Sequence, residues 1–410
     1  MSNRTPRIYR RVEERLSFAA PHIDGFKGQL HDSGYSAATI EELVRLLAGW
    51  TDWMSAAGFK FDGILAGFEA SMLVVKDPER IKRPGDISQA SMGAAKSFIR
   101  FLQDQGILEK PAMPPTALET WPILRDFRDW MRQHRGLAET TLDFYQDVII
   151  DFLKALGDDP KFFTAEAIRT FVLQRARPHG HERARGITVA TRAFLRFLVA
   201  SGQCPAGRDY AVPSFANWKL VSVPKFLVAE DIERMISVCD GESRLRDKAV
   251  VLLLARLGLR ASEVANLKFG DIEWTTGRVA VCGKSRREEW LPLTQEVGDA
   301  ILAYLDRGRP PLSEPRLFIT DIAPLRPLSR IAVKCIVTRT LARAGIKSAA
   351  KGAHVLRHSA ATAMLRHGVS LAGVGAVLRH RSARMTMHYA KVDFDLLSEI
   401  AQSWPGRPSC

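Results

Sequence analysis

The segment 354-HVLRH-358 places two histidines and an arginine within five residues of an otherwise apolar helical pattern. Imidazole exchanges protons near neutral pH, whereas a guanidinium stays charged and binds oxyanions through a planar fork of donors. His354 and Arg357 are three residues apart and therefore share a helix face. The spacing of His354 and His358 also fits a metal pair, but no acidic or cysteine ligand lies nearby, so we expect no metal. Helix packing alone does not require these side chains, which makes the segment a candidate functional site.

Two charged positions earlier in the chain are less specific. Arg260 follows an apolar helical pattern, and Glu263 lies one turn later on the same face. Taken alone, this pair is more simply a structural ion pair, because a buried arginine requires a partner. Lys284 lies in a polar turn, where a single lysine is ordinarily solvated. Neither position indicates chemistry without the others.

The elements that must position these residues are mostly helical. Residues 228–239 and 247–267 have helical patterns, and the second is strongly apolar. Residues 277–283 and 289–293 have strand character on either side of the polar turn, which predicts a β-hairpin that carries Lys284. Helical patterns then continue to the end of the chain.

Composition narrows the class of protein. The chain has 410 residues, enough for about two or three domains, and a formal charge of +14. This excess indicates a polyanionic partner, with nucleic acid first, although it can also be only a solvated basic surface. The five cysteines are scattered and form no C-x-x-C pair, which argues against a disulfide framework or a zinc site. With no apolar run long enough for a membrane span and no secretory signal, we expect a cytoplasmic protein.

The first half of the chain contains a repeat. Residues 34–50 align without a gap with residues 136–152, and residues 96–106 match residues 192–202 more closely still. All four segments have the period of an amphipathic helix, which predicts two helical units of about a hundred residues each, although any two amphipathic helices share some likeness. The expected domains are residues 1–110, residues 112–205, a linker at 206–226 and a last domain at 227–410.

Basic residues gather outside these motifs. The start of the chain is rich in arginine, and four arginines in 175–186 lie between two helical patterns, where they could neutralise phosphates along a duplex. The alternative is a solvated turn. Two more arginines lie in the turn of the predicted hairpin. The candidate DNA contacts are Arg175, Arg177, Arg183, Arg185, Arg286 and Arg287.

Taken in order, the motifs GLRASE, CGK, HVLRH, 377-VLRH-380 and 386-TMHYAKV-392 resemble the catalytic domain of the tyrosine recombinase, or phage-type integrase, family. The resemblance covers about residues 222–395, and residues 112–205 resemble the family's core-binding domain more loosely. It implies a mainly α-helical fold, in which two core-binding-like units precede a mostly helical catalytic domain with a small β-hairpin.

Carried over residue by residue, the resemblance implies a nucleophile, Tyr389, and a pair of arginines, Arg260 and Arg357. Lys284 falls on the family's hairpin lysine. The two remaining positions of the family's set are occupied by His354 and His380.

The sequence departs from the family's common pattern at three positions. Ser285 and Glu289 stand where the hairpin turn usually has a glycine and an arginine, and Arg379 replaces the glycine of an LGH motif. These changes leave the chemistry intact and affect the turn conformation and the local DNA contacts.

The chemistry implied by the resemblance is strand transfer at a phosphodiester. Two arginines would stabilise the charge that develops on the non-bridging oxygens, and Glu263 would hold one of them in place. His354 would take the proton of the nucleophile, Lys284 would protonate the leaving 5′ oxygen, and His380 would orient the phosphate. His358 is expected to be structural. The product is a 3′-phosphotyrosyl link that keeps the energy of the broken bond, so no cofactor is expected.

The sequence therefore predicts a site-specific recombinase or integrase of a mobile element, acting on double-stranded DNA at the nucleoid and not at a membrane. A tetramer of identical or different subunits on paired sites is expected, with helper recombinases as further candidate partners. A terminal helix over residues 394–404 with one apolar stripe would dock on a neighbouring subunit or on its own domain. Two alternatives stay open: an architectural or accessory DNA-binding protein of the same fold, and a type IB topoisomerase-like enzyme.

Overall fold

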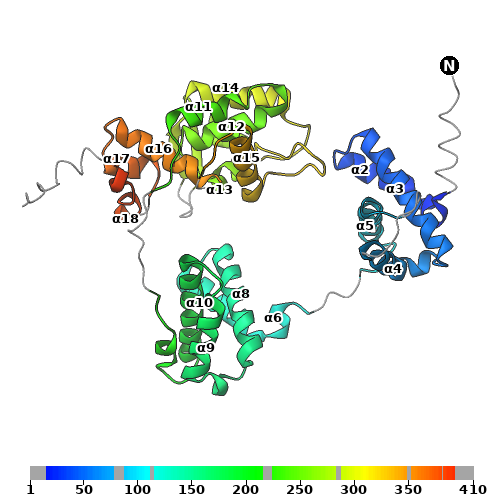
Figure 1. The fold of residues 1–410 in the computed structure, drawn as a ribbon, viewed down its shortest axis with the longest axis horizontal. Helices are drawn as coiled ribbons and strands as arrows, with labels where there is room; N and C mark the ends of the chain where they lie inside the picture. The colour runs from blue at the N-terminus through cyan, green and yellow to red at the C-terminus, as the bar shows by residue number, and fades with distance from the viewer. Residues whose placement is uncertain are drawn as a thin grey trace, which may run out of the picture. The chain divides into compact units, whose positions relative to one another are not determined.

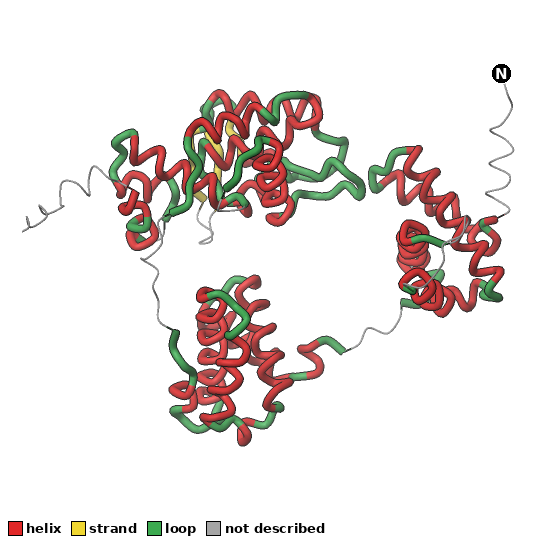
Figure 2. The backbone as a smooth tube through the Cα atoms, viewed as in Figure 1, coloured by secondary structure: helices red, strands yellow, loops and turns green. Residues whose placement is uncertain are grey.

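The computed structural model describes residues 15–77, 87–110, 115–215, 224–282, 288–348, 352–380 and 382–392. In these ranges the chain is mainly helical, with one small antiparallel sheet of three strands (Figure 2). This confirms the fold class expected from the sequence. Some predicted features lie outside the described residues, namely residues 1–14, Lys284, Arg286, Arg287 and the terminal helix at 394–404.

The first group of helices buries a core of its own. Ser36 caps the start of its longest helix, because its Oγ accepts a hydrogen bond from the backbone N–H of Thr39 at 3.3 Å. Ser88 caps a later helix in the same way, through the N–H of Ser91 at 3.1 Å. The α-helices of this bundle in the described ranges are α2 (Ile23–Asp32), α3 (Ala37–Ala56), α4 (Ile64–Lys76) and α5 (Gln89–Asp104) (Figure 1).

The described residues between Glu109 and Val221 form a compact unit around a second core. Gly136 ends one helix in the left-handed conformation, with φ of +55°, which glycine adopts without steric cost. Val212 is 3% exposed and belongs to this core, so the first part of the segment expected to be a linker packs on the bundle. The α-helices here are α6 (Ala117–Thr120), α7 (Pro122–Arg135), α8 (Glu139–Leu156), α9 (Ala165–Ala176) and α10 (His181–Ala200).

The two bundles pack their aromatic cores with the same geometry. In the first, the ring centroid of Phe26 lies 5.3 Å from that of Phe98 and 5.7 Å from that of Phe101, at interplanar angles of 78° and 48°. The matching values in the second are 5.3 Å and 5.7 Å, at 79° and 50°. The rings there are Phe127, Phe194 and Phe197. The repeat found in the sequence therefore recurs in the packing.

The last described part of the chain contains the sheet and further helices around a third core. The strands β1 (Ile272–Glu273), β2 (Arg278–Cys282) and β3 (Glu288–Pro292) pair in that order, and Val279 lies opposite Leu291. The apolar helix α12 packs against α14, α15 and α16 at the centre of this part. The helices are α11 (Ala229–Ser237), α12 (Leu245–Ala255), α13 (Ala261–Asn266), α14 (Gln295–Ala303), α15 (Arg330–Arg343), α16 (His354–Arg366), α17 (Leu371–Val377) and α18 (Ala383–Thr386).

One expectation about these helices is wrong. The apolar pattern at 247–267 is not one helix, because α12 ends at Ala255 and α13 begins at Ala261. Gly258 lies in the break at φ +59°, and a Cβ there would be 2.6 Å from Cδ2 of Leu378. The break requires glycine and turns the residues after it into the start of a new helix.

Within the described ranges, no helix has both the length and the apolar character that crossing a membrane requires. The four cysteines found there, Cys204, Cys239, Cys282 and Cys335, are not joined in disulfides.

Candidate active site

The HVLRH segment forms the first turns of α16. His354 is the first residue of the helix and is exposed, whereas Arg357 is only 4% exposed. The buried guanidinium donates hydrogen bonds through Nη1 to the carbonyl of Gly258 at 2.5 Å and through Nη2 to the carbonyl of Leu378. Burial lowers the pKa of Arg357 to about 10, with a further contribution from the charge of Arg260, so the group stays charged at neutral pH. The break at Gly258 thus supplies an acceptor that orients Arg357.

Arg260 occupies the N-cap position of α13, next to the carboxylate of Glu263. Its backbone N–H donates to Oε2 of that carboxylate at 2.7 Å, and its Nη1 donates to Oε1 at 2.6 Å. Its Nη2 donates to the backbone carbonyl of Arg379 at 3.3 Å. The simple ion pair considered from the sequence exists, and it also directs the guanidinium toward the residues that precede His380.

Arg379 supplies a third guanidinium to the site, at the position where the family usually has glycine. Its φ is +55°, a left-handed conformation that a side chain rarely adopts. The side chain is 3% exposed and Nη2 donates to Oε2 of Glu263 at 2.9 Å, while Nε is buried without a hydrogen-bond partner. Arg260 and Arg379 therefore share one carboxylate, and the cluster keeps an excess of positive charge that suits an anion.

Tyr389 begins a short 3₁₀ turn, Tyr389–Val392, and is 3% exposed. Its hydroxyl lies 2.7 Å from Nδ1 of His358, and its ring stacks on that of His380 with centroids 6.0 Å apart. Burial raises the pKa of Tyr389, and the charges of Arg357 and Arg260 oppose that rise. The phenol is therefore close enough to both arginines for their charges to affect its pKa.

The two half-buried histidines beside Tyr389 are neutral at pH 7. Burial lowers the pKa of His358 to about 4, with help from His354 and His388. Burial and the charge of Arg357 lower the pKa of His380 to about 4. His380 Nδ1 lies 2.8 Å from Oγ1 of Thr386, which fixes the orientation of the ring. Both rings therefore offer one donor and one acceptor each rather than a charge.

The structure brings together most of the residues predicted from the motifs. Arg260, Glu263, Arg357, His380 and Tyr389 converge from α13, α16 and the segment after α17. The ring centroid of His354 lies 6.1 Å from that of His358, on which it stacks, and His358 is the ring that contacts the phenol. An open cleft of about 1080 Å³ adjoins the site, and Arg379, His380 and Thr386 are among the residues that line it. In the described ranges, no group of three His, Cys, Asp or Glu side chains is arranged to hold a metal.

Sequence reasoning missed the contacts of two residues. His358 was expected to be structural, and its contact with the hydroxyl of Tyr389 was not foreseen. Arg379 was noted only as a departure from the family, although it joins the buried ion pair of Arg260 and Glu263. No periodicity links positions 358 and 389, so no signal in the sequence pointed to the first contact. The exchange of glycine for arginine was a usable signal for the second.

The arginines proposed from the sequence as DNA contacts differ in their surroundings. Arg175 is paired with Asp151, with 2.7 Å between Nη2 and Oδ2. The guanidinium of Arg183 lies 5.6 Å from the ring centroid of Phe144. Arg177 and Arg185 are exposed. Arg175 is thus held by an ion pair within its own bundle, whereas the other three arginines are exposed to solvent.

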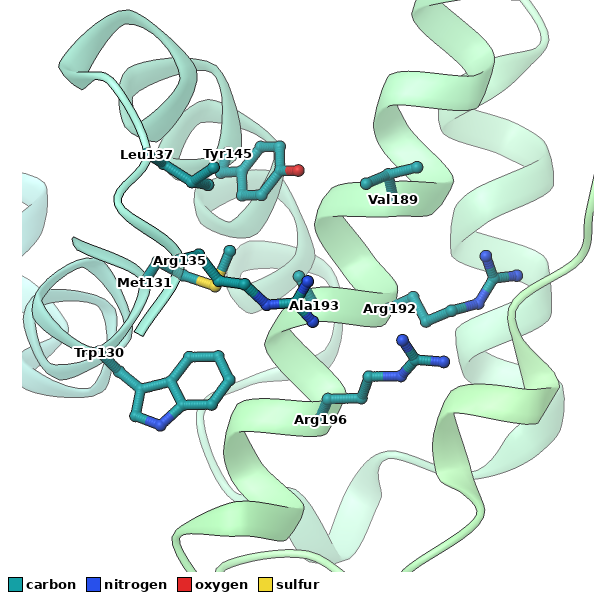
Figure 3. A pocket seen from close by; sticks show the side chains of 9 residues that line it. All are labelled: Trp130, Met131, Arg135, Leu137, Tyr145, Val189, Arg192, Ala193 and Arg196. Atoms are coloured by element: carbon teal, nitrogen blue, oxygen red, sulfur yellow. The ribbon is translucent and has the colours of Figure 1, made fainter. Parts of the chain in front are cut away.

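A second group of arginines in this bundle was not singled out from the sequence. Arg192 and Arg196 extend from one face of α10, and Arg135 comes from the end of α7 (Figure 3). Together with Trp130 and Tyr145 they line a pocket of about 240 Å³. Arg192 donates to the carbonyl of Val212 at 2.9 Å, and Arg196 donates to Asp209 at 2.8 Å. These two arginines hold the segment after α10 against the bundle.

Comparison with known proteins identifies the family. Residues 225–395 match the Phage integrase family. The chain is 35% identical over 396 residues to a Sinorhizobium fredii protein named as an integrase/recombinase, y4rA, and the alignment covers 94% of this chain and 95% of that protein. It is 29% identical over 310 residues to the tyrosine recombinase XerC of Oceanobacillus iheyensis, covering 74% of this chain and 92% of XerC. The structure of the Tn1549 transposon integrase with a circular intermediate DNA has a TM-score of 0.52 at 14% identity, covering 68% of this chain and 99% of that chain.

The chain belongs to the tyrosine recombinase, or phage integrase, family. It is an enzyme of the tyrosine-type site-specific recombinase class, as the motifs predicted. The roles of its individual side chains stay predictions.

Proposed function

We propose that this recombinase integrates or transposes the DNA of a mobile element through a 3′-phosphotyrosyl intermediate. The observation that carries the proposal is the buried Tyr389, whose pKa is affected by the charges of both Arg357 and Arg260. A phenol beside two fixed guanidinium groups suits nucleophilic attack on a phosphodiester. The integrase/recombinase name of the Sinorhizobium relative and the transposon integrase of similar fold support the mobile-element role.

In the proposed reaction, the Tyr389 oxygen forms a bond to phosphorus while the bond from phosphorus to the 5′ oxygen breaks. Arg260 and Arg357 bind the non-bridging oxygens as their negative charge grows, and Glu263 keeps Arg260 in position. Their hydrogen bonds to backbone carbonyls fix both guanidinium groups before the substrate arrives. This preorganisation avoids the cost of arranging the charges during the reaction.

Proton transfer and substrate orientation fall to three other residues in this proposal. His354 takes the phenol proton, and Lys284 gives a proton to the leaving 5′ oxygen. His380 donates a hydrogen bond to the phosphate, which is possible because its Nδ1 is turned toward Thr386 and its other nitrogen is available. A second strand with a free 5′ hydroxyl then reverses the step and completes the exchange.

Double-stranded DNA is the proposed partner. The formal charge of +14 and the exposed Arg177, Arg183 and Arg185 support contacts with phosphates, and the hairpin arginines Arg286 and Arg287 stay proposed contacts. The transposon integrase of similar fold is itself recorded in complex with DNA. We place the protein at the nucleoid in the cytoplasm, as a tetramer of identical or different subunits on paired sites, with helper recombinases as further partners.

The proposed domain division has two core-binding-like units, at 1–110 and 112–205, before a linker and a catalytic domain at 227–410. The matched aromatic triads of the two bundles support a common origin for the first two units. If the first unit contacts DNA, removing residues 1–110 will shorten the DNA footprint and weaken binding at raised salt. An unchanged footprint with unchanged salt dependence would contradict that role.

The experiment that tests the proposed function uses a nicked suicide substrate carrying the true recombination site. Wild type should become covalently joined to a 3′ DNA end, and the adduct should persist after denaturation. Tyr389→Phe should bind the duplex normally but give no adduct. Arg260→Ala and Arg357→Ala should lose about 10²–10³-fold in adduct formation, as expected when a key donor to developing charge is removed.

The same experiment separates the alternatives. Tight binding by wild type without any adduct would favour an architectural or accessory protein. An adduct at any sequence, together with relaxation of supercoiled plasmid, would favour a type IB topoisomerase. An adduct that survives in Tyr389→Phe would require another nucleophile. Tyr304 is the weaker candidate for that role, because it is 1% exposed and its hydroxyl accepts from the backbone N–H of Ile319 at 3.3 Å.

A further inference from the structure

In the part of the chain that the structure describes, His358 makes the polar contact to the hydroxyl of the proposed nucleophile. Its Nδ1 lies 2.7 Å from the hydroxyl of Tyr389, and the two ring centroids are 5.5 Å apart. The contact joins the second turn of α16 to the 3₁₀ turn that begins at Tyr389, 31 residues later in the chain. Among the described residues, this is the hydrogen bond that holds the phenol oxygen.

The surroundings of His358 determine the protonation states of the two groups in this hydrogen bond. The ring is half-buried between His354, with centroids 6.1 Å apart, and His388, with centroids 6.2 Å apart. Burial keeps the imidazole neutral at pH 7, and burial also keeps the proton on the phenol. A phenol that holds its proton can donate it to a ring nitrogen that carries none, and we infer the tautomer in which Nδ1 accepts and Nε2 carries the hydrogen of His358.

Apolar packing holds the ring of Tyr389 in a buried cluster that includes Leu365, Val374 and Leu378, but these side chains offer no hydrogen bond to the hydroxyl. The residue lies at the start of a four-residue 3₁₀ turn that follows the four-residue helix α18, and such short elements hold a side chain less firmly than a long helix. Stacking on the His380 ring, with an interplanar angle of 3°, limits the plane of the phenol. Packing and stacking place the ring, and the hydrogen bond with His358 is the polar contact that fixes the hydroxyl.

We propose that His358 is a positioning residue of strand transfer, whose Nδ1 accepts the hydrogen bond that fixes the Tyr389 hydroxyl in the site. This inference rests on the proposed role of Tyr389 as the nucleophile. In the proposed reaction His354 remains the group that takes the proton as the phenol attacks, so what His358 contributes before that step is the direction of the phenol oxygen. Small errors in the placement of a reacting atom reduce rates by about 10²-fold.

A pair of amide variants tests the position of the acceptor. The Oδ1 atom of asparagine can occupy the place of a histidine Nδ1, whereas glutamine carries its oxygen one methylene further out. His358→Asn should therefore form the covalent adduct within a few-fold of the wild-type rate, and His358→Gln should be slower by about 10–100-fold in single turnover at saturating protein. His358→Leu, which has no acceptor, should match His358→Gln.

Controls separate positioning from folding and binding. DNA affinity and hydrogen exchange of α16 should be the same in His358→Asn and His358→Gln, so that the difference lies in the chemical step alone. His367 is an exposed histidine near the end of the same helix, with Nδ1 against the carbonyl of Ala363, and His367→Gln should not change the adduct rate. If His358→Leu fails to fold, the comparison of His358→Asn with His358→Gln still tests the proposal.

Two outcomes would overturn the proposal, and a third would contradict the proposed function on which it rests. Equal, near wild-type rates in His358→Asn and His358→Gln would show that the hydrogen bond has no role in the reaction. Equal losses in both, with intact folding and DNA binding, would make the histidine itself the proton acceptor. Absence of the adduct in wild type would instead contradict the proposed function, and that result is distinguishable because it does not depend on residue 358.

Discussion

Among the described residues, Glu263 is the carboxylate bonded to both Arg260 and Arg379, and its charge can be removed with little change of shape. In Glu263→Gln both guanidinium groups stay in place but lose the carboxylate that lies 2.6 Å from one and 2.9 Å from the other. The carboxylate side chain and that of Arg379 are each 3% exposed. Removing one partner of a buried ion pair costs about 3–5 kcal/mol, because the remaining charge is left without compensation in a medium that solvates it poorly.

The matched control is Asp231→Asn in the same part of the chain. Asp231 and Arg234 have the same three-residue spacing as Arg260 and Glu263, but the arginine is 59% exposed and the aspartate 20%. An exposed pair of this kind contributes about 0–1 kcal/mol. Hydrogen exchange followed by mass spectrometry, on peptides that cover α12 to α13, measures the loss of stability locally in the full chain.

The excess of positive charge in Glu263→Gln provides a second, independent readout. An anion that binds the folded site stabilises it, so sulfate at about ten times its dissociation constant should restore about 1.4 kcal/mol. Wild type should respond less, because its carboxylate already occupies two of the guanidinium groups. A loss no larger than that of Asp231→Asn, or an equal response to sulfate in both proteins, would refute the idea that Glu263 compensates this cluster.

Three further predictions concern the pH dependence, the helix break and the repeated core. His358 and His380 have folded pKa values of about 4, below the ordinary value of 6.5, so the unfolded chain binds protons first as the pH falls. The free energy of unfolding should therefore be unaffected by these two histidines above pH 6.5 and should decrease from there toward pH 4. Urea titrations should show a slope of up to about 1.4 kcal/mol per pH unit for each histidine, and the slope should be smaller in His358→Asn. Gly258→Ala should lower the free energy of unfolding by about 2–5 kcal/mol, and Gly277→Ala by about 1–2 kcal/mol. Both glycines have φ near +60°, but only the new Cβ at position 258 would collide with Leu378. Phe26→Ala and Phe127→Ala should each destabilise their own bundle by about 3–5 kcal/mol, and unequal values in local hydrogen exchange would contradict the equivalence of the two cores.

The sequence alone determined the family, the mainly helical fold and the repeat in the first half. These features depend on local patterns: the period of apolar residues, the glycines that end helices, and motifs such as GLRASE and HVLRH in a fixed order. The β-hairpin followed in the same way from two short strand-like runs around a polar turn. Patterns of this kind can be recognised because each is formed by residues close together in the chain.

Local patterns also gave one wrong element. Residues 247–267 were expected to be one apolar helix, yet the chain breaks between Ala255 and Ala261. The helical period continues across the break, and Gly258 was a local signal of the break that the period outweighed. The choice of residue at position 258 depends on the close approach of Leu378, whose side chain leaves room only for glycine there.

Tertiary structure decided the contacts that make the site. The bond between His358 and Tyr389 spans 31 residues, and that between Arg379 and Glu263 spans 116. Neither pair is related by a helix or strand period, so each contact exists only once packing has brought the segments together. The buried state of Arg379 and the lowered pKa of His358 depend in turn on the solvent that this packing excludes. Residue types and their order thus follow from the sequence, whereas the distances and charges between them arise from the folded chain, because burial and long-range contact are properties of the fold.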